Sequence, residues 1–292
     1  MSWQQIKVNV DAQDAETVGD FLIENNAQAV TFVDAKDTPI FEPKPGEILL
    51  WPSTQVIGLY PAQADMTDLI DNLASMPCFN TSFHYALDQL EDKDWEREWM
   101  DNFHPMQFGE RLWICPSWRE IPEPDAINIM LDPGLAFGTG THPTTSLCLK
   151  WLDAQDLEQK SIVDFGCGSG ILALAALLLG AKHAVGIDID PQALLASRQN
   201  AEKNAVEARL SLYLPPEQPA VEVDIVMANI LAGPIKELHQ VITDFCLPGG
   251  KLMLSGILDC QAEEVLAVYQ DNFDFDPVAV EGEWVRLTGT KR

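Results

Sequence analysis

The apolar and polar positions near the start of the chain predict short strands that alternate with amphipathic helices. Residues 6–10 alternate between apolar and polar side chains, which is the period of a half-buried strand. Residues 14–25 carry apolar side chains at helical spacing. Further segments follow: strands at 29–34, 54–60 and 81–86, and a helix at 66–76. The order strand–helix–strand–strand–helix–strand predicts a smaller ferredoxin-like α+β domain over residues 1–86.

A charged segment, residues 87–106, separates this region from the rest of the chain. Trp95 and Trp99 lie four residues apart, so a helix here would place both rings on one face. We therefore predict a helical linker over residues 87–106, whose tryptophans dock against a domain or against a partner.

From residue 161 onward, apolar strands alternate with helices. The predicted strands are 161–165, 184–189, 208–214, 224–228, 251–255, 274–280 and 284–290, and the predicted helices are 171–179, 191–205, 234–245 and 261–270. Strands that alternate with helices form a parallel sheet covered on both faces. The pattern predicts an α/β domain over residues 107–292 with a doubly wound, mostly parallel Rossmann-like sheet. Such sheets bind ligands at the carboxyl ends of their strands.

Length and composition exclude several classes of protein. The chain has 292 residues, of which 47% are hydrophobic and 22% charged, as in ordinary globular proteins of one or two domains. Its apolar runs are too short to span a bilayer, and its first residues do not resemble a secretory signal. The six cysteines form no Cys-x-x-Cys pair, so neither a disulfide framework nor a metal site is expected. A cytoplasmic protein that does not bind membranes is predicted.

The charge balance argues against a nucleic-acid partner. The chain carries 45 acidic and 18 basic residues, giving a net charge of −27. Both halves are acidic, because residues 1–123 hold 22 acidic and 7 basic side chains (−15) and residues 124–292 hold 23 and 11 (−12). Nucleic-acid affinity comes largely from basic side chains, so direct DNA binding is not expected. A positively charged protein would be attracted.

Three glycines after the strand at 161–165 give the most specific motif. Gly166, Gly168 and Gly170 allow a sharp turn that a ligand can approach closely. A dinucleotide fingerprint would need a third glycine at position 171, where the chain has Ile171. The spacing resembles instead the first motif of class I methyltransferases, which use S-adenosylmethionine.

An acidic residue lies at the end of the second predicted strand, 184–189. Asp188 lies 22 residues beyond Gly166, and its carboxylate can accept hydrogen bonds from the hydroxyls of an adenosine ribose. The alternative is that Asp188 or Asp190 caps the helix that starts at Pro191, which suits Asp190 better.

Asn229 ends the strand at 224–228. Methyltransferases of amino groups often carry Asn or Asp here, followed by two prolines and an aromatic residue. The side-chain oxygen of such an Asn can accept a hydrogen bond from the target nitrogen. This chain has Ile230, Leu231 and Ala232 at the next positions, which disfavours a flat amide or adenine target. The alternative for Asn229 is a helix cap before Pro234.

A loop over residues 131–145 is rich in glycine, proline and threonine. With the glycine turn and Asn229, this loop resembles the bacterial family of methyltransferases that modify the large-subunit ribosomal protein L-eleven (L11), and the resemblance covers the whole chain. It implies that Thr145, Gly166, Gly168, Asp188 and Asn229 contact S-adenosylmethionine. It also implies that Phe137, Gly138 and Thr139 line the pocket in which Asn229 and the acceptor amine meet the methyl group.

The resemblance also assigns roles to the domains. The N-terminal domain is expected to recognise the ribosomal protein, and the linker to let it move relative to the catalytic domain. The expected reaction is trimethylation of lysine side chains and of the N-terminal α-amine, by a monomer. Two alternatives stay open: a methyltransferase for another protein or a small-molecule amine, and a non-catalytic binding module on the same fold.

Overall fold

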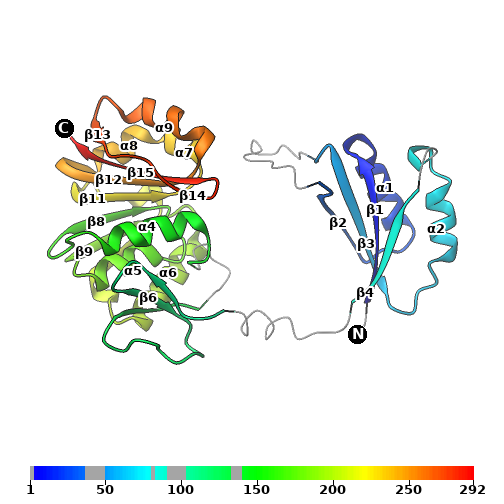
Figure 1. Ribbon diagram of the computed structural model, residues 1–292, viewed down its shortest axis with the longest axis horizontal. Coiled ribbons are helices and arrows are strands. Elements are labelled where there is room, and N and C mark those ends of the chain that lie inside the picture. The colour runs from blue at the N-terminus through cyan, green and yellow to red at the C-terminus, as the bar shows by residue number, and fades with distance from the viewer. Residues whose placement is uncertain (1–2, 37–49, 80–82, 91–102, 133–139) are drawn as a thin grey trace. The chain divides into compact units, whose positions relative to one another are not determined.

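The chain divides into two units, residues 1–100 and residues 101–292, which each have their own core (Figure 1). The computed structural model describes residues 3–36, 50–79, 83–90, 103–132 and 140–292. Within these residues, no helix is long and apolar enough to cross a membrane. The same residues contain no group of three or more His, Cys, Asp or Glu side chains arranged to hold a metal ion.

The first unit is an antiparallel sheet with two helices on one face. In chain order its elements are β1 (Trp3–Asp11), α1 (Ala12–Glu24), β2 (Ala29–Asp34), β3 (Ser53–Pro61), α2 (Thr67–Ala74) and β4 (Tyr85–Leu90). The strand order is β2–β3–β1–β4, and all neighbours are antiparallel. Alternate residues of β1 and β3, such as Ile6 and Val56, are buried with the apolar faces of α1 and α2. These are the topology and layers of a ferredoxin-like fold, as predicted.

The last strand of this unit lies later than the sequence predicts. β4 runs from Tyr85 to Leu90 along β1, whereas the pattern indicates a strand at 81–86. The polar residue Asp88 belongs to the strand, where it pairs with Gln5 of β1 and its carboxylate forms an ion pair with Lys7 at 2.7 Å. The helical linker predicted over residues 87–106 therefore begins inside β4. Its tryptophans, Trp95 and Trp99, lie outside the described residues.

The second unit begins with a small sheet that the sequence pattern does not predict. Its strands are β5 (Met106–Phe108), β6 (Leu112–Cys115) and β7 (Ile127–Met130). Strands of three or four residues show too few alternations to be recognised. The turn between β5 and β6 is held by Asp153, the last residue of α4 (Pro143–Asp153), which accepts hydrogen bonds from the backbone of Glu110 (2.6 Å) and Arg111 (3.2 Å).

The main sheet of the second unit is doubly wound, as predicted. Its strands are β8 (Ser161–Phe165), β9 (His183–Ile187), β10 (Leu210–Tyr213), β11 (Val223–Asn229), β12 (Cys246–Leu258), β13 (Phe273–Phe275), β14 (Ala279–Glu281) and β15 (Trp284–Lys291). The order is β10–β9–β8–β11–β12–β15–β13, with β14 paired to β15. The first five of these strands are parallel, and β15 is antiparallel to β12 and β13.

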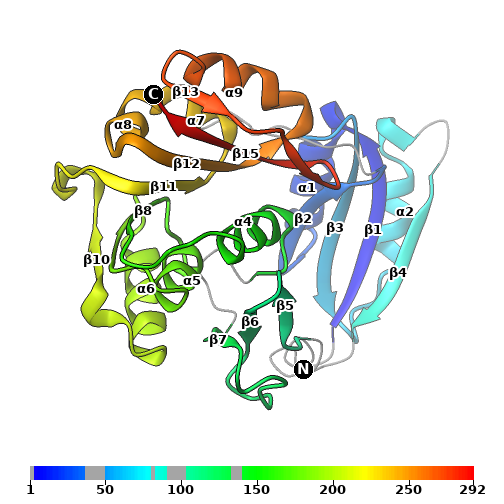
Figure 2. The same cartoon turned by 60° about the vertical axis from the view of Figure 1, so that its left-hand side comes forward.

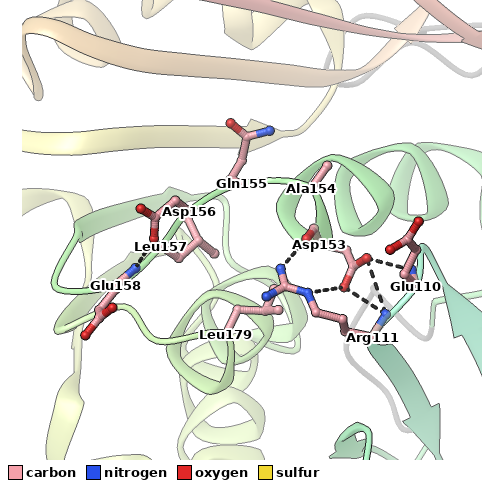
Figure 3. Close-up of a pocket in the computed structure, with 9 residues that line it drawn as sticks. All are labelled: Glu110, Arg111, Asp153, Ala154, Gln155, Asp156, Leu157, Glu158 and Leu179. Carbon is pink, nitrogen blue, oxygen red and sulfur yellow. Dashed lines mark hydrogen bonds and ion pairs between the residues drawn. The ribbon is translucent and has the colours of Figure 1, made fainter.

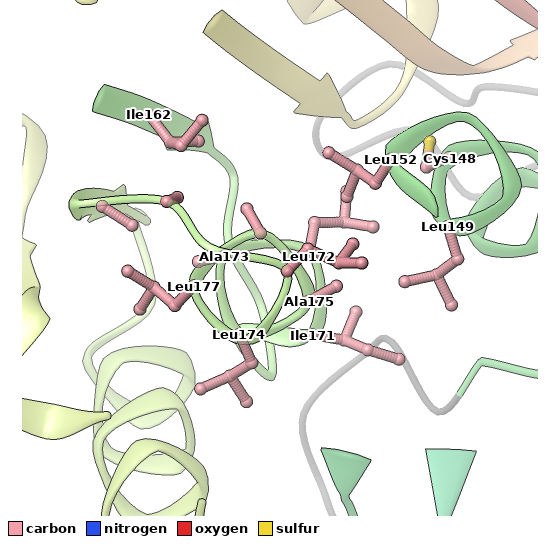
Figure 4. Close-up of a cluster of buried hydrophobic side chains, with 14 of the residues drawn as sticks. Cys148, Leu149, Leu152, Ile162, Ile171, Leu172, Ala173, Leu174, Ala175 and Leu177 are labelled. Carbon is pink, nitrogen blue, oxygen red and sulfur yellow. The ribbon is translucent and has the colours of Figure 1, made fainter. Parts of the chain in front are cut away.

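Helices cover both faces of this sheet (Figure 2). The helices are α4, α5 (Ile171–Leu178), α6 (Pro191–Lys203), α7 (Ala232–Glu237), α8 (His239–Asp244) and α9 (Ala262–Tyr269). Ile162 and Ile225 of the sheet pack with α4, α5 and α6, whereas the adjacent Val163 and Val226 pack with α7, α8 and α9. Helix α5 is buried on every side from Ile171 to Leu177, in the middle of the first of these clusters (Figure 4).

Two predicted elements of this unit are each divided in the structure. The helix predicted at 234–245 is two helices, α7 and α8, because Leu238 leaves the helical conformation (φ −96°, ψ 14°). The strand predicted at 274–280 is β13 and β14, which pair with opposite ends of β15. Pro277 lies between them and lacks the N–H group that a continuous ladder needs.

Candidate functional site

The carboxyl ends of β8 and β11 form the point at which the sheet changes direction. These two central strands are neighbours, and the chain leaves β8 toward α5 on one face and leaves β11 toward α7 on the other. Doubly wound sheets bind ligands in the crevice at such a point. The glycine turn follows β8, Asp188 follows β9, and Asn229 ends β11. Residues far apart in the sequence thus reach one edge of the sheet.

The glycine turn needs its glycines for conformation and for space. Gly166, Gly168 and Gly170 have φ values of +76°, +53° and +80°, which side chains other than glycine rarely adopt. A Cβ atom at Gly166 would overlap the side chain of Ile230, and one at Gly170 would lie 2.8 Å from Ser197 Oγ. The contact with Ile230 also shows that the turn lies directly beside the Asn229 segment.

Polar residues of α6 fix the backbone of this turn. Ser197 Oγ donates to the carbonyl oxygen of Gly168 at 2.8 Å, and Asn200 Nδ2 donates to that of Ser169 at 2.9 Å. Sequence analysis does not identify either residue as part of the site. The available signal is their spacing of three residues, which places two polar side chains on the face of α6 turned toward the turn.

The Asp188 carboxylate contacts the glycine turn and can accept further hydrogen bonds. Its Oδ2 accepts from the backbone N–H of Gly168 at 2.8 Å, and its Oδ1 accepts from that of Asp190 at 2.9 Å. A carboxylate has about four acceptor positions, so two remain for the hydroxyls of a ribose. Asp190 itself caps α6 by accepting from Gln192 N at 2.8 Å, which confirms the capping alternative for that residue.

An exposed isoleucine adjoins this carboxylate. Ile189 is 84% exposed, although it directly follows a buried strand. An exposed apolar side chain beside Asp188, the carboxylate predicted to bind a ribose, offers a surface on which an aromatic base can pack. Sequence analysis does not single out Ile189, because its exposure follows from the end of β9 and not from any pattern.

Asn229 and Thr145 meet across the crevice. The side chain of Thr145, in the first turn of α4, is fully buried, and its Oγ1 lies 3.5 Å from Asn229 Nδ2. The other atom of the amide, Asn229 Oδ1, is buried and has no hydrogen-bond partner within the described part of the chain. Asn229 does not cap α7, whose N-cap residue is Leu231. A buried acceptor without a partner is costly, so its presence beside the glycine turn indicates a site for a donor from a ligand.

The loop predicted to cover the site is described only at its ends. Phe137, Gly138 and Thr139 lie outside the described residues. At the N-terminal end, Asp132 accepts hydrogen bonds from Ser117 N (2.7 Å) and Ser117 Oγ (2.9 Å). At the other end, His142 caps α4 through Nδ1, and burial lowers its pKa.

A buried carboxyl group lies beneath the crevice. Asp164, in β8, is 1% exposed, and its Oδ2 accepts from Ala173 N at 3.0 Å. Burial raises the pKa of Asp164 to about 7, against the lowering effect of that hydrogen bond, and the charge of Asp188 raises it further. Near neutral pH this group can therefore gain or lose a proton.

A separate pocket lies at the opposite edge of the sheet (Figure 3). It has a volume of about 510 Å³ and is lined by the end of α4, residues 154–158 before β8, and the end of α5. Arg111 is engaged there by Asp153, through an ion pair at 3.4 Å and a hydrogen bond to its carbonyl oxygen. These partners join the small sheet to α4, and none of the predicted site residues lines the pocket.

The chain matches one protein family along almost its whole length. The family model described as "Ribosomal protein L11 methyltransferase (PrmA)" matches residues 2–292. A relative from Alteromonas mediterranea, named "Ribosomal protein L11 methyltransferase", is 61% identical over 292 residues, which is 100% of both chains. A relative of the same name from Edwardsiella ictaluri is 62% identical over 295 residues, again 100% of both chains.

A solved structure agrees with these relatives. It is the crystal structure of a ribosomal protein L11 methylase from Lactobacillus delbrueckii subsp. bulgaricus, which is 29% identical to this chain. The TM-score is 0.58, and the match covers 65% of this chain and 100% of that one.

The buried carboxyl group makes stability depend on pH in a defined direction. The pKa of Asp164 is about 7 in the folded protein and 3.8 ordinarily, so the folded state keeps a proton that the unfolded state releases between these values. The neutral carboxyl group favours the folded state. Its full contribution to the free energy of unfolding is present below pH 4 and is lost as pH rises toward 7. At pH 8, Asp164→Asn should therefore raise the unfolding temperature relative to the unmodified protein. The corresponding gain in the free energy of unfolding is at most about 4 kcal/mol.

Thermal unfolding between pH 5 and pH 8 measures this effect. The advantage of Asp164→Asn should shrink as pH falls, while Asp271→Asn, at an exposed aspartate, should show no such trend. A constant difference between Asp164→Asn and the unmodified protein at every pH would show that the carboxyl group does not titrate in this range.

Proposed function

The chain belongs to the ribosomal protein L11 methyltransferase family, and we propose that it transfers methyl groups to the lysine side chains and the N-terminal α-amine of that protein. Membership confirms the resemblance indicated by the motifs. The methyl donor is S-adenosylmethionine, the cofactor of this methyltransferase class. The choice of an amine as acceptor rests on Asn229 Oδ1, which is buried and has no hydrogen-bond partner among the described residues.

The residues at the carboxyl edge fit this cofactor. Asp188 has two acceptor positions left for the ribose, and Ile189 offers an apolar surface to the adenine. The backbone of Gly166 and Gly168 permits close approach, because neither residue has a side chain. Together with Thr145 and Asn229, these are the positions that we propose for cofactor binding. When bound, the cofactor supplies an electrophilic methyl group carried by a sulfonium.

Asn229 is proposed to orient the acceptor amine. Its Oδ1 accepts an N–H hydrogen bond from the amine, so that the nitrogen lone pair points toward the methyl group. Methyl transfer is an in-line displacement, and correct alignment supplies much of the catalysis of such a reaction. We also propose that the methyl-transfer pocket is lined by Phe137, Gly138 and Thr139.

The acceptor must also be neutral. Deprotonating a lysine with a pKa near 10.4 costs about 4–5 kcal/mol at pH 7. Desolvation in the crevice and proximity of a cationic sulfonium both favour the neutral amine. We propose that solvent accepts the proton, with no side chain serving as a dedicated base.

We further propose that the first unit recognises L11 and that the second performs the chemistry. The two units have separate cores, and the predicted site residues all belong to the second. The net charge of −27 favours a basic protein substrate. The monomeric state, the cytoplasmic location and the lack of DNA binding stay predictions.

Methylation of purified L11 tests the function and the role of Asn229 together. With S-adenosylmethionine, the protein should add methyl groups to lysines and to the N-terminus of L11, as measured by mass spectrometry of its peptides. Asn229→Ala should lower kcat by roughly 100-fold, since that is the typical effect of losing one hydrogen bond to a reacting group. Cofactor affinity should fall much less than kcat, because the proposed bond to the amine is made only in the complex with L11.

Asn272→Ala is the matched control, since Asn272 is exposed and its hydrogen bonds within the described residues are made by its backbone. L11 that stays unmodified by the parent protein would refute the proposed function. Full turnover by a folded Asn229→Ala variant would refute only the role of that residue.

Removing the first unit tests the division of labour. Residues 101–292 alone should bind S-adenosylmethionine with nearly unchanged affinity, because the predicted cofactor residues lie in that unit. The kcat/KM for L11 should fall by at least about tenfold, since binding energy from remote parts of a substrate is lost. Calorimetry measures the affinity for S-adenosylmethionine, and mass spectrometry of L11 peptides measures kcat/KM. Equal kcat/KM values for the shortened and complete chains would contradict the proposal.

A further inference from the structure

One face of α4 contacts the hairpin formed by β14 and β15. His142, Ser146 and Lys150 lie at intervals of four residues, so they share a face of the helix. The ring of His142 meets that of Trp284 edge-on, with centroids 4.8 Å apart. Ser146 Oγ and Lys150 Nζ both donate to Oε2 of Glu281, at 3.0 Å and 2.8 Å.

A second residue of the hairpin engages the helix backbone. Arg286 Nη1 donates a hydrogen bond to the carbonyl oxygen of Leu147 at 2.9 Å. In the register of the hairpin, Glu281 lies opposite Trp284, and Arg286 is two residues further along β15. All three side chains therefore project from the same face of the hairpin, toward α4. These contacts act together with the buried side chains of α4 to set the position of the helix against the hairpin.

The position of α4 matters because of what its first turn carries. Thr145 is adjacent to Ser146, and its hydroxyl is the described partner of Asn229 Nδ2. The distance of 3.5 Å is at the outer limit of a hydrogen bond, so a small displacement of α4 would break it. The amide of Asn229 would then be free to rotate, and its oxygen would no longer be held toward the acceptor.

We propose that Glu281 is a positioning residue for methyl transfer. By holding Ser146 and Lys150, it keeps Thr145 against Asn229 and so keeps Asn229 Oδ1 directed at the amine. This inference rests on the proposed function and names a further residue that the same reaction needs. The sequence motifs give no sign of it, because Glu281 lies in a three-residue edge strand distant from every motif.

The contacts of Glu281 are better suited to positioning than to stability. The side chains of Lys150 and Glu281 are 48% and 36% exposed. Ion pairs in contact with solvent add little to folding stability. Ser146 is buried and would lose an acceptor, so a substitution at Glu281 should lower the unfolding temperature slightly, leave the protein folded and alter the chemistry step.

Steady-state kinetics on L11 test the proposal through separate values of kcat and KM. Glu281→Ala should lower kcat by about tenfold, since small misplacements of catalytic groups have effects of this order. The KM for L11, the affinity for S-adenosylmethionine and the unfolding temperature should stay close to those of the parent protein. Glu281→Gln keeps an acceptor for Ser146 and should recover most of the lost kcat.

Glu264→Ala is the matched control, because it removes a solvent-exposed ion pair with Lys236 at 2.6 Å on other helices. Its kcat should equal that of the parent protein. A kcat for Glu281→Ala equal to this control would overturn the proposal, as would a loss of kcat that Glu281→Gln does not restore. An inactive parent protein would instead show that the proposed function has failed.

Discussion

The site depends on a turn whose conformation is fixed mainly by contacts with its neighbours. Gly166, Gly168 and Gly170 adopt positive φ, which leaves the backbone open to a ligand but gives these three residues no side-chain packing of their own. Hydrogen bonds donated by α6 and accepted by Asp188 hold the turn, together with its own buried Cys167 and backbone hydrogen bonds to Ile187. In the proposed function Asp188 has two roles, because the carboxylate that holds the turn would also accept hydrogen bonds from the ribose.

The negative charge of the chain favours the approach of two cations, the sulfonium cofactor and a lysine that is still protonated. A sulfonium donor and a protonated amine repel each other, whereas the chain around them carries a net charge of −27. Asp164 adds a group that burial keeps near its titration point, with a pKa of about 7. Burial of the acceptor favours the neutral amine over its protonated form. Asn229 offers the amine a neutral amide oxygen, whereas a carboxylate at this position would stabilise the protonated amine.

Sequence patterns were sufficient for the five parallel strands of the main sheet, since these apolar segments alternate with helices and the glycine spacing after β8 is specific. They failed where structure depends on distant partners. Asp88 looks like linker sequence until its pairing with Lys7 is known, and Leu238 shows no sign of the break between α7 and α8. In the site, Asp188 and Asn229 could be found from their positions after strands. Ser197 could not, because its role is a contact between helix α6 and the turn that only the fold creates.

Calorimetric titration with S-adenosylmethionine tests the central claim, that this turn and its aspartate form the cofactor site. Saturable binding is predicted for the unmodified protein, with affinity reduced by at least about tenfold in Asp188→Ala, which loses two bonds to hydroxyls. Asp188→Asn, which keeps one acceptor, should fall between them. Asp190→Ala, which removes a carboxylate two residues away that caps α6, should bind like the unmodified protein. An absence of saturable heat, or equal affinities for the folded Asp188→Ala and Asp190→Ala variants, would contradict the account.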